Sequence, residues 1–214
     1  MKLIILAAGD AFELDGYSKL LINHPIENKN ILEIYSEVFS VKDIIIVVGF
    51  KAIEVMNKYP QFTYIYNKKW QTSGSSFSLS LALDDEPCYV VSSDILLDKK
   101  TIDSISKYEN CALIKYSDNK RQSSINTKIE NNQINGIYSG LSQNNDPELL
   151  GVYKISNISL LKEWKKNCMV NYQSYAGENL PLVEDIPIDI FEASDNVFEI
   201  NTPEDYIKFL RKIS

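Results

Sequence analysis

Residues 3–9 read Leu-Ile-Ile-Leu-Ala-Ala-Gly, and this stretch near the start of the chain decides the fold. Its first four side chains are large and apolar without a polar interruption, which predicts a strand buried on both faces, as in a parallel sheet. The small residues Ala7, Ala8 and Gly9 follow where the strand would turn. Ligands of open α/β sheets bind beyond the carboxyl ends of the strands, so this turn is a candidate ligand site, although small residues also suit a tightly packed turn.

Similar apolar runs alternate with helical patterns along the rest of the chain. Such alternation predicts right-handed βαβ units, and we expect a three-layer α/β fold around a doubly wound, mostly parallel mixed sheet. Strands are expected at 3–6, 44–48, 62–66, 88–91, 112–116, 134–138, 149–155, 186–191 and 198–201, and helices at 31–38, 53–59, 77–83 with its Ser-rich start, 159–166 and from 202 onward.

No linker rich in Gly, Pro or Ser divides the 214 residues, so we expect residues 1–214 to form one domain. Residues 117–147 are polar and rich in Asn and Ser, with turns expected near Gly136 and Gly140. We interpret this segment as a small β-rich insertion that covers a pocket as a lid.

Charge and cysteine usage exclude several classes of function. The 22 Lys and Arg against 29 Asp and Glu give a net charge of −7, which argues against nucleic-acid binding. Cys88, Cys111 and Cys168 lack CxxC spacing, which favours reduced thiols in a cytoplasmic protein over disulfides or zinc. No apolar run approaches the roughly 18–20 residues of a membrane span, and the short apolar start is not typical of a secretory signal.

Polar residues at the ends of apolar runs are the candidates for chemistry. Lys19 precedes an apolar run and could place a point charge on a phosphoryl group, unless it is an ordinary solvated lysine. Asp94 follows the strand 88–91, where a carboxylate suits Mg²⁺ bound with phosphate oxygens; a helix cap is the alternative. Alternation places Glu199 and Asn201 on one side of the last strand, with Asn201 as an oxygen ligand or a loop cap.

These pieces together resemble the nucleotidylyltransferases of the sugar-nucleotide and molybdenum-cofactor type. The likeness rests on Leu-Ala-Ala-Gly at 6–9, on Lys19, on Asp94 and on Asn-Thr-Pro-Glu-Asp at 201–205, in that order along the whole chain. Within this group the chain is most similar to bacterial CTP:phosphocholine cytidylyltransferases and related small cytidylyltransferases.

The resemblance implies a Mg²⁺-dependent transfer of CMP from CTP to a small phosphorylated substrate, with release of pyrophosphate. It gives catalytic roles to Lys19 and Asp94, and Mg²⁺ to Asp94 and Asn201. CTP is favoured over UTP or GTP, and monomer and homodimer both stay open. The nucleotide-binding residues that it implies are Leu6, Ala7, Ala8, Gly9, Lys19, Gly74, Ser75 and Ser76.

The acceptor pocket is expected between the insertion and residues 172–185. Tyr175, Glu178 and Asp185 there form an aromatic and acidic mix that suits a cationic head group such as choline, through cation–π and carboxylate contacts. An ordinary acidic surface loop is the alternative interpretation, and a sugar 1-phosphate is the rival substrate class.

Three positions depart from the family pattern. Glu13 stands where an arginine is usual, Ser18 where a proline is usual, and Asn201 where an aspartate is most common. A carboxylate at position 13 would repel a triphosphate, so another cation must substitute, or the chain is a non-catalytic nucleotide-binding relative. An NAD-binding Rossmann protein is disfavoured, because the turn lacks the third glycine and the acidic residue about 20 positions later.

Overall fold

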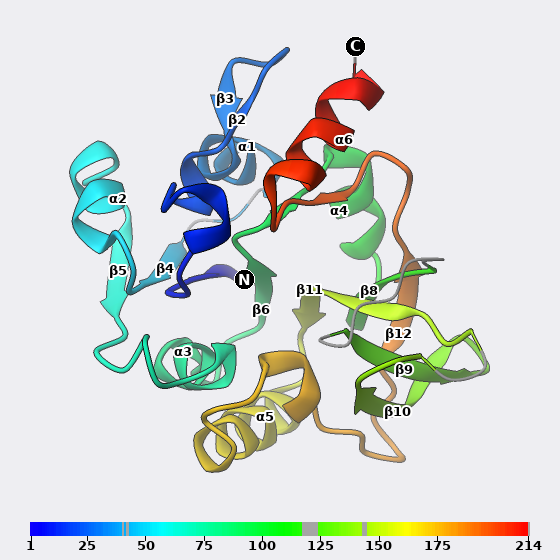
Figure 1. Cartoon of the computed structure of the whole chain (residues 1–214). Coiled ribbons are helices and arrows are strands. Elements are labelled where there is room, and N and C mark those ends of the chain that lie inside the picture. The colour runs from blue at the N-terminus through cyan, green and yellow to red at the C-terminus, as the bar shows by residue number, and fades with distance from the viewer. Residues whose placement is uncertain (40, 42, 117–123, 143–144, 214) are drawn as a thin grey trace.

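The computed structural model describes residues 1–39, 41, 43–116, 124–142 and 145–213. These residues form a nine-stranded mixed sheet in the order β5-β4-β1-β6-β11-β8-β12-β10-β9 (Figure 1). Its strands are β1 (Lys2–Ala7), β4 (Ile44–Val48), β5 (Thr63–Tyr66), β6 (Cys88–Ser92), β8 (Asn110–Lys115), β9 (Ile125–Glu130), β10 (Gln133–Ser139), β11 (Glu148–Ile155) and β12 (Asp189–Glu192).

The sheet is mixed: parallel pairing fills one half and recurs once in the other half, between β8 and β12. β5, β4, β1 and β6 are parallel neighbours, with Ile4 opposite both Ile45 and Val90. β11 then runs antiparallel to β6 and β8, and β10 runs antiparallel to β9 and β12. The expected mixed sheet is therefore confirmed, with parallel neighbours in the first half and between β8 and β12. The other pairs of the second half are antiparallel, and the two-residue connection between β9 and β10 can only join antiparallel strands.

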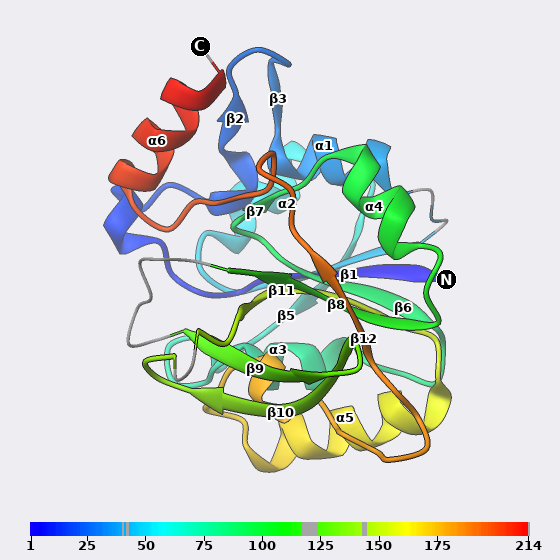
Figure 2. The same ribbon diagram turned by 90° about the vertical axis from the view of Figure 1, so that its right-hand side faces the viewer.

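The alternating side chains of β1 divide the core into two clusters. Leu3 and Ile5 point to one face, and Ile4 and Leu6 point to the other. Figure 2 shows α1, α2, α4 and α6 on the first face, with α3 and α5 on the second, which confirms three layers. The helices are α1 (Ile31–Val38), α2 (Ala52–Lys58), α3 (Ser75–Ala82), α4 (Lys99–Ile105), α5 (Ile158–Val170) and α6 (Pro203–Ile213).

Short elements complete the described chain and position the site. A two-stranded pairing of β7 (Ile95–Leu96) with β13 (Phe198–Glu199) joins the middle of the chain to its C-terminal segment. The other short elements are β2 (Asn23–His24) and β3 (Lys29–Asn30), which pair with each other, and the 3-10 helices η1 (Phe12–Leu14), η2 (Lys19–Leu21) and η3 (Ala176–Asn179).

The expected insertion contains a β-hairpin made by β9 and β10. Gly136 lies inside β10, where the pairing with β9 shifts register, so the turn expected there is absent. Gly140 follows β10 with a φ of +112°, as a turn requires. Residues 117–123 and 143–144 of the insertion lie outside the described residues, and the lid stays a prediction. None of the helices in the described chain is long and apolar enough to cross a membrane.

Candidate active site

The carboxyl ends of β1 and β6 bring the first candidate residues to one edge of the sheet. Leu6 lies opposite Ser92 in the parallel register, and the N–H of Ser93 donates to the carbonyl of Leu6 at 3.2 Å. The turn after β1 and Asp94 therefore leave the sheet side by side. Figure 2 shows this edge on its left, where the loop after β1 and α6 lie together.

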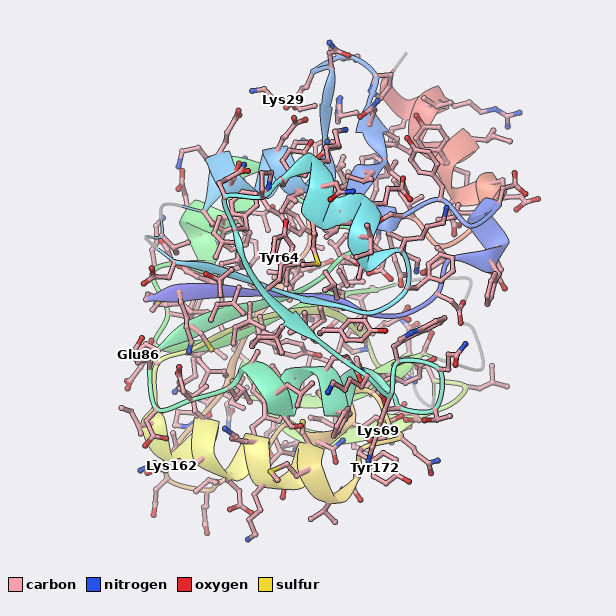
Figure 3. The ribbon with its side chains drawn as sticks, turned by 90° about the vertical axis from the view of Figure 1, so that its left-hand side faces the viewer. Lys29, Tyr64, Lys69, Glu86, Lys162 and Tyr172 are labelled. Carbon is pink, nitrogen blue, oxygen red and sulfur yellow. The ribbon has the colours of Figure 1, made fainter. Side chains whose placement is uncertain are left out.

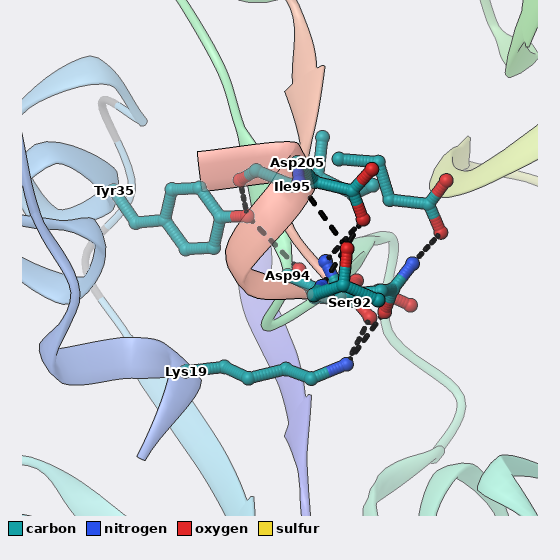
Figure 4. A network of polar contacts seen from close by, with 9 residues as sticks. Lys19, Tyr35, Ser92, Asp94, Ile95 and Asp205 are labelled. Atoms are coloured by element: carbon teal, nitrogen blue, oxygen red, sulfur yellow. Dashed lines mark hydrogen bonds and ion pairs between the residues drawn. The ribbon is translucent and has the colours of Figure 1, made fainter. Parts of the chain in front are cut away.

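The side chains of Lys19, Asp94 and Asn201 meet at this edge, and Figure 4 labels Lys19 and Asp94. The Lys19 ammonium donates to Asp94 Oδ2 at 3.0 Å and to Asn201 Oδ1 at 2.7 Å. The side chains of Lys19 and Asp94 are only 19% and 20% exposed, so this ion pair is screened less than a surface pair. The structure therefore places Lys19, Asp94 and Asn201 side by side, and their roles in catalysis and metal binding stay predictions.

Backbone pairing explains how Asp94 reaches Asn201. Glu199 pairs with Ile95 in the β7–β13 ladder, and the N–H of Ile200 donates to the carbonyl of Asp94 at 2.8 Å. The N–H of Asn201 in turn donates to the Asp205 carboxylate at 3.2 Å. The backbone on both sides of the two candidate ligands is thus fixed by hydrogen bonds.

A capping box at residues 202–205 opens α6. The hydroxyl of Thr202 accepts from the N–H of Asp205 at 3.2 Å, and the carboxylate of Asp205 accepts from the N–H of Thr202 at 3.1 Å. This cap fixes the direction in which the chain leaves Asn201. The sequence pattern Asn-Thr-Pro-Glu-Asp therefore has a structural role next to its proposed chemical one.

Tyr35 of α1 forms hydrogen bonds with the backbone on either side of Asp94. Its buried hydroxyl lies 2.9 Å from the carbonyl oxygen of Ser92 and also hydrogen-bonds the carbonyl of Ile95 (Figure 4). Burial raises the pKa of Tyr35 well above its usual value, and the charge of Asp94 adds to this shift. Tyr35 is therefore a neutral hydrogen-bond donor at all physiological pH values.

Lys19 is held by the apolar run that follows it. Lys19 opens η2, and Leu20 and Leu21 of the same short helix are buried in the core. The N–H of Ile22 donates to the carbonyl of Lys19 at 3.2 Å. The run that made Lys19 a candidate in the sequence therefore anchors its backbone, while the long side chain reaches the sheet edge.

The turn after β1 leaves room beside Gly9. A Cβ built on Gly9 would meet no atom within 4 Å, so the missing side chain opens space toward solvent. By contrast, a Cβ on Gly49 would lie 2.5 Å from both the carbonyl oxygen of Ala8 and Cβ of Trp70. The turns after β1 and β4 are thus packed closely. A small cavity at this point is lined by Ala7, Gly9, Ala11, Ser18, Lys19, Leu20, Phe50 and Ser93.

The loop between Gly9 and Lys19 folds on itself through the carbonyl of Ala11, which accepts from Leu14 and Gly16, each at 3.0 Å. Glu13 is exposed in η1. The ring of Phe12 packs on Phe50 at a centroid distance of 5.3 Å. The carboxylate of Glu13 is therefore exposed to solvent, and among the described residues it forms no ion pair that would fix it against a ligand.

Gly74, Ser75 and Ser76 at the start of α3 are tied to the segment before and within η3. The hydroxyl of Ser75 accepts from the N–H of Ala176 at 2.8 Å, and that of Ser76, which is fully buried, accepts from the amide of Asn179 at 2.7 Å. The N–H of Gly74 donates to the carbonyl of Tyr172 at 2.9 Å. These groups hold two segments together, and their contact with a nucleotide stays a prediction.

An aromatic pair and a lysine lie next to the start of α3. The Lys69 ammonium sits 5.2 Å from the ring centroid of Phe77 and 5.6 Å from that of Tyr172. Figure 3 shows Lys69 and Tyr172 close together at this corner of the molecule. No sequence pattern predicts this cluster, because its members come from three separate segments.

The three predicted acceptor residues do not lie together. The hydroxyl of Ser139, at the end of β10, donates to the carboxylate of Glu178 in η3, which joins the insertion to this segment. Tyr175 is 51% exposed one residue before η3. Asp185 lies elsewhere: β12 is parallel to β8 and begins opposite Cys111, so the chain enters β12 from the amino edge of the sheet. The structure therefore does not bring Asp185 to the edge that carries Asp94.

The donor set at the sheet edge fits a magnesium ion that substrate oxygens complete. A carboxylate oxygen of Asp94 and the amide oxygen of Asn201 already converge on one cation, the Lys19 ammonium. Mg²⁺ is bound by one or two protein carboxylates together with phosphate oxygens and water. In the described part of the chain, no three His, Cys, Asp or Glu side chains gather into a self-sufficient metal site.

Comparison with known proteins places these features in context. No family model matches the chain. The chain is 26% identical over 238 aligned positions to a choline-phosphate cytidylyltransferase of Haemophilus influenzae, covering 100% of this chain and 98% of the relative. A solved CTP:phosphocholine cytidylyltransferase from Streptococcus pneumoniae superposes with a TM-score of 0.75 at 17% identity, over 100% of this chain and 99% of that one. The chain has the nucleotidylyltransferase fold.

A second solved structure extends the likeness. An inositol-1-phosphate CTP transferase from T. maritima superposes with a TM-score of 0.73 at 15% identity, over 99% of this chain and 95% of that one. The resemblance to cytidylyltransferase-like nucleotidylyltransferases predicted from the sequence is confirmed.

Two residues of this nucleotidylyltransferase fold escaped the site prediction. Tyr35 lies in the helix expected at 31–38, and no sequence pattern indicates that its hydroxyl would contact the carbonyls of Ser92 and Ile95 on either side of Asp94. Glu199 was placed on the side of Asn201 without a role, yet its carboxylate accepts from the Asn201 amide at 2.7 Å. The spacing Glu-x-Asn in an extended segment is the signal that could have found it.

Proposed function

We propose that this protein is a nucleotidyltransferase that moves CMP from CTP to a small phosphorylated amine or alcohol, such as phosphocholine, and releases pyrophosphate. The observation that carries the proposal is the convergence of Lys19, Asp94 and Asn201 at the carboxyl edge, beside the open turn at Gly9. Similarity over the full chain to a choline-phosphate cytidylyltransferase supports the choice of CTP and phosphocholine as first substrates.

The reaction needs positioned charge and no protein nucleophile. An oxygen of the acceptor phosphate attacks the α-phosphorus of CTP in line, the bond from that phosphorus to the bridging oxygen breaks, and pyrophosphate leaves with the electron pair. Burial raises the pKa values of Cys88, Cys111 and Cys168 to about 12, so these thiols are not thiolates that could compete as nucleophiles.

Each group at the edge has a separate task. The turn at Ala8 and Gly9 lets the nucleotide approach the backbone, since no side chain fills the space beside Gly9. Lys19 stabilises the charge that develops on the phosphate oxygens. Asp94 and Asn201 would hold Mg²⁺, which when bound neutralises charge on the phosphates. A protein of net charge −7 with an exposed Glu13 needs these cations to bind a triphosphate.

The acceptor is proposed to bind where η3 meets the insertion. Glu178 and Tyr175 offer a carboxylate and an exposed ring there, and the contact of Glu178 with Ser139 fixes the carboxylate at the insertion. A cationic head group gains from both kinds of contact. Sugar or inositol phosphates are the second candidate class, favoured by the structural likeness to an inositol-1-phosphate CTP transferase.

Pyrophosphate release tests this proposal. The purified protein with Mg²⁺ is offered each of the four nucleoside triphosphates with phosphocholine, phosphoethanolamine, inositol 1-phosphate or glucose 1-phosphate. We expect turnover with CTP and a phosphorylated amine above all other pairs. Turnover with a sugar phosphate alone would instead identify sugar or inositol phosphates as the substrate class. Nucleotide binding without turnover for any pair would support a non-catalytic relative and overturn the proposal.

A further inference from the structure

The amide of Asn201 can serve a cation in only one of its two orientations. Its oxygen is an acceptor and its NH₂ group is a double donor, so a half-turn of the side chain exchanges attraction for repulsion. In the structure Oδ1 faces the Lys19 ammonium at 2.7 Å, and Nδ2 donates to Oε1 of Glu199 at 2.7 Å. Glu199 is therefore the group that distinguishes the two orientations.

Backbone contacts leave this rotation as the main freedom at position 201. The N–H of Ile200 donates a hydrogen bond to the carbonyl of Asp94, and the N–H of Asn201 donates one to the carboxylate of Asp205. Glu199 itself is fixed through the pairing of β13 with β7. Because an extended segment points alternate residues the same way, Glu199 and Asn201 lie on one side with the distance that a hydrogen bond needs.

The contact between Glu199 and Asn201 also changes the charge around the cation. Lys19 carries one positive charge and Asp94 one negative charge, while the amide of Asn201 carries none. The carboxylate of Glu199 supplies a negative charge on the far side of the Asn201 amide, in addition to the carboxylate of Asp205 at the backbone N–H of Asn201. A hydrogen bond from Nδ2 to a carboxylate also polarises the amide, which makes its oxygen a stronger cation ligand.

We propose that Glu199 is a positioning residue for the metal site. It holds the Asn201 amide with its oxygen toward the cation, and it replaces the negative charge that an aspartate at position 201 would carry. This inference rests on the proposed function, because it assumes that Asp94 and Asn201 receive Mg²⁺ with the nucleotide. It concerns this chain in particular, since it joins an asparagine to a carboxylate two residues earlier.

The metal contribution to CTP binding is the quantity to measure. The dissociation constant of CTP is determined by calorimetry in Mg²⁺ and again in EDTA, without an acceptor, so that no turnover occurs. The ratio of the two constants reports the metal site and not the nucleotide pocket alone. Because partners behind a metal ligand typically contribute 10–100-fold in metal affinity, we expect Glu199→Ala to lower this ratio by about 10-fold or more.

Two variants separate orientation from charge. Glu199→Gln keeps an oxygen that accepts from Asn201 but loses the charge, so we expect a loss smaller than that of Glu199→Ala. Glu204→Gln removes an exposed carboxylate at the start of α6 and serves as the matched control, with a ratio within about twofold of the wild-type protein, because exposed charges contribute little.

The decisive experiment replaces Asn201, the residue that Glu199 contacts. Asn201→Asp removes the NH₂ group and supplies its own charge, so Glu199→Ala in that background is expected to leave the Mg²⁺ dependence unchanged or to increase it. The proposal is overturned if Glu199→Ala keeps the wild-type ratio, or if it causes the same loss in both backgrounds. A wild-type protein whose CTP affinity does not respond to Mg²⁺ would instead remove the metal site of the proposed function, and this inference with it.

Discussion

The N–H of Ile200 donates to the carbonyl oxygen of Asp94 at 2.8 Å, which joins the middle of the chain to its C-terminal segment. The carboxylate of Asp94 and the amide oxygen of Asn201, the residue after Ile200, both accept hydrogen bonds from the Lys19 ammonium. Three distant segments thus form one cation-binding corner at the end of β6.

Replacing Asp94 by asparagine tests the charge at this corner. Asp94→Asn keeps an acceptor for Lys19 but removes the negative charge, so we expect cytidylyl transfer to fall by about 100-fold or more. The melting temperature should change by no more than a few degrees. Activity is measured by pyrophosphate release and stability by thermal unfolding. Asp103→Asn, which removes an exposed ion pair with Lys99 on α4, is the control and should leave both unchanged.

Lys19→Met tests the lysine while keeping most of its apolar stem. We expect kcat to fall by roughly 10²–10³-fold, because a preorganised charge on the reacting phosphates is lost. Lys68→Met is the control: it removes an exposed lysine just after β5 and should keep full activity. Equal activities of the two variants would show that Lys19 is an ordinary structural lysine.

Tyr35→Phe removes the donor that serves two carbonyl groups around Asp94. We expect the free energy of unfolding to fall by about 1–2 kcal/mol, because buried acceptors lose a partner. Chemical denaturation at pH 7 measures this loss. Retention of wild-type stability would mean that other groups hold the backbone around Asp94.

The pKa of Tyr35 predicts a second difference between the same two proteins. Because the folded pKa lies above the unfolded value near 10, the neutral hydroxyl favours the folded state fully below pH 10, and this contribution is lost as pH rises above 10. The slope that one such group adds is about 1.4 kcal/mol per pH unit. The wild-type protein should therefore lose stability more steeply than Tyr35→Phe between pH 10 and 11. Parallel curves would contradict the buried, neutral state of Tyr35.

Two glycines near the site should respond oppositely to alanine. A Cβ on Gly74 would lie 2.0 Å from the carbonyl oxygen of Ser174, so Gly74→Ala should destabilise the protein by about 1–3 kcal/mol. A Cβ on Gly9 would meet no protein atom, so Gly9→Ala should keep the melting temperature but weaken CTP binding several-fold. Calorimetry with CTP and thermal unfolding measure the two effects. Unchanged CTP affinity in Gly9→Ala would remove this turn from the nucleotide site.

Local patterns in the sequence predicted most of the layered core. The uninterrupted apolar runs predicted β1, β4 and β6, because a strand buried on both faces leaves no polar position. The helix α4 was missed because it begins with two lysines, although its cap is readable: the Asp98 carboxylate accepts from the N–H of Thr101 at 2.6 Å. The strand β9 was missed because its sequence is mostly polar.

Contacts between distant segments were the part that the sequence could not supply. Gly9 and Asp94, which follow the strands expected at 3–6 and 88–91, could be predicted at one edge because parallel strands share their carboxyl ends, a rule that needs no distances. The entry of the chain into β12 from the opposite edge, which separates Asp185 from the site, depends on strand order. The hydrogen bonds of the Tyr35 hydroxyl around Asp94 depend on how α1 packs against the sheet, which local sequence patterns also do not specify.

Direct detection of the product tests the central claim. The wild-type protein and Asp94→Asn are each incubated with CTP, phosphocholine and Mg²⁺, and the mixtures are followed by ³¹P nuclear magnetic resonance. We predict that the wild-type protein forms the cytidine diphosphate ester of choline and pyrophosphate in equal amounts, and that Asp94→Asn forms at most about 1% as much in the same time. Product formation at equal rates by both proteins would contradict the assignment of this corner as the active site.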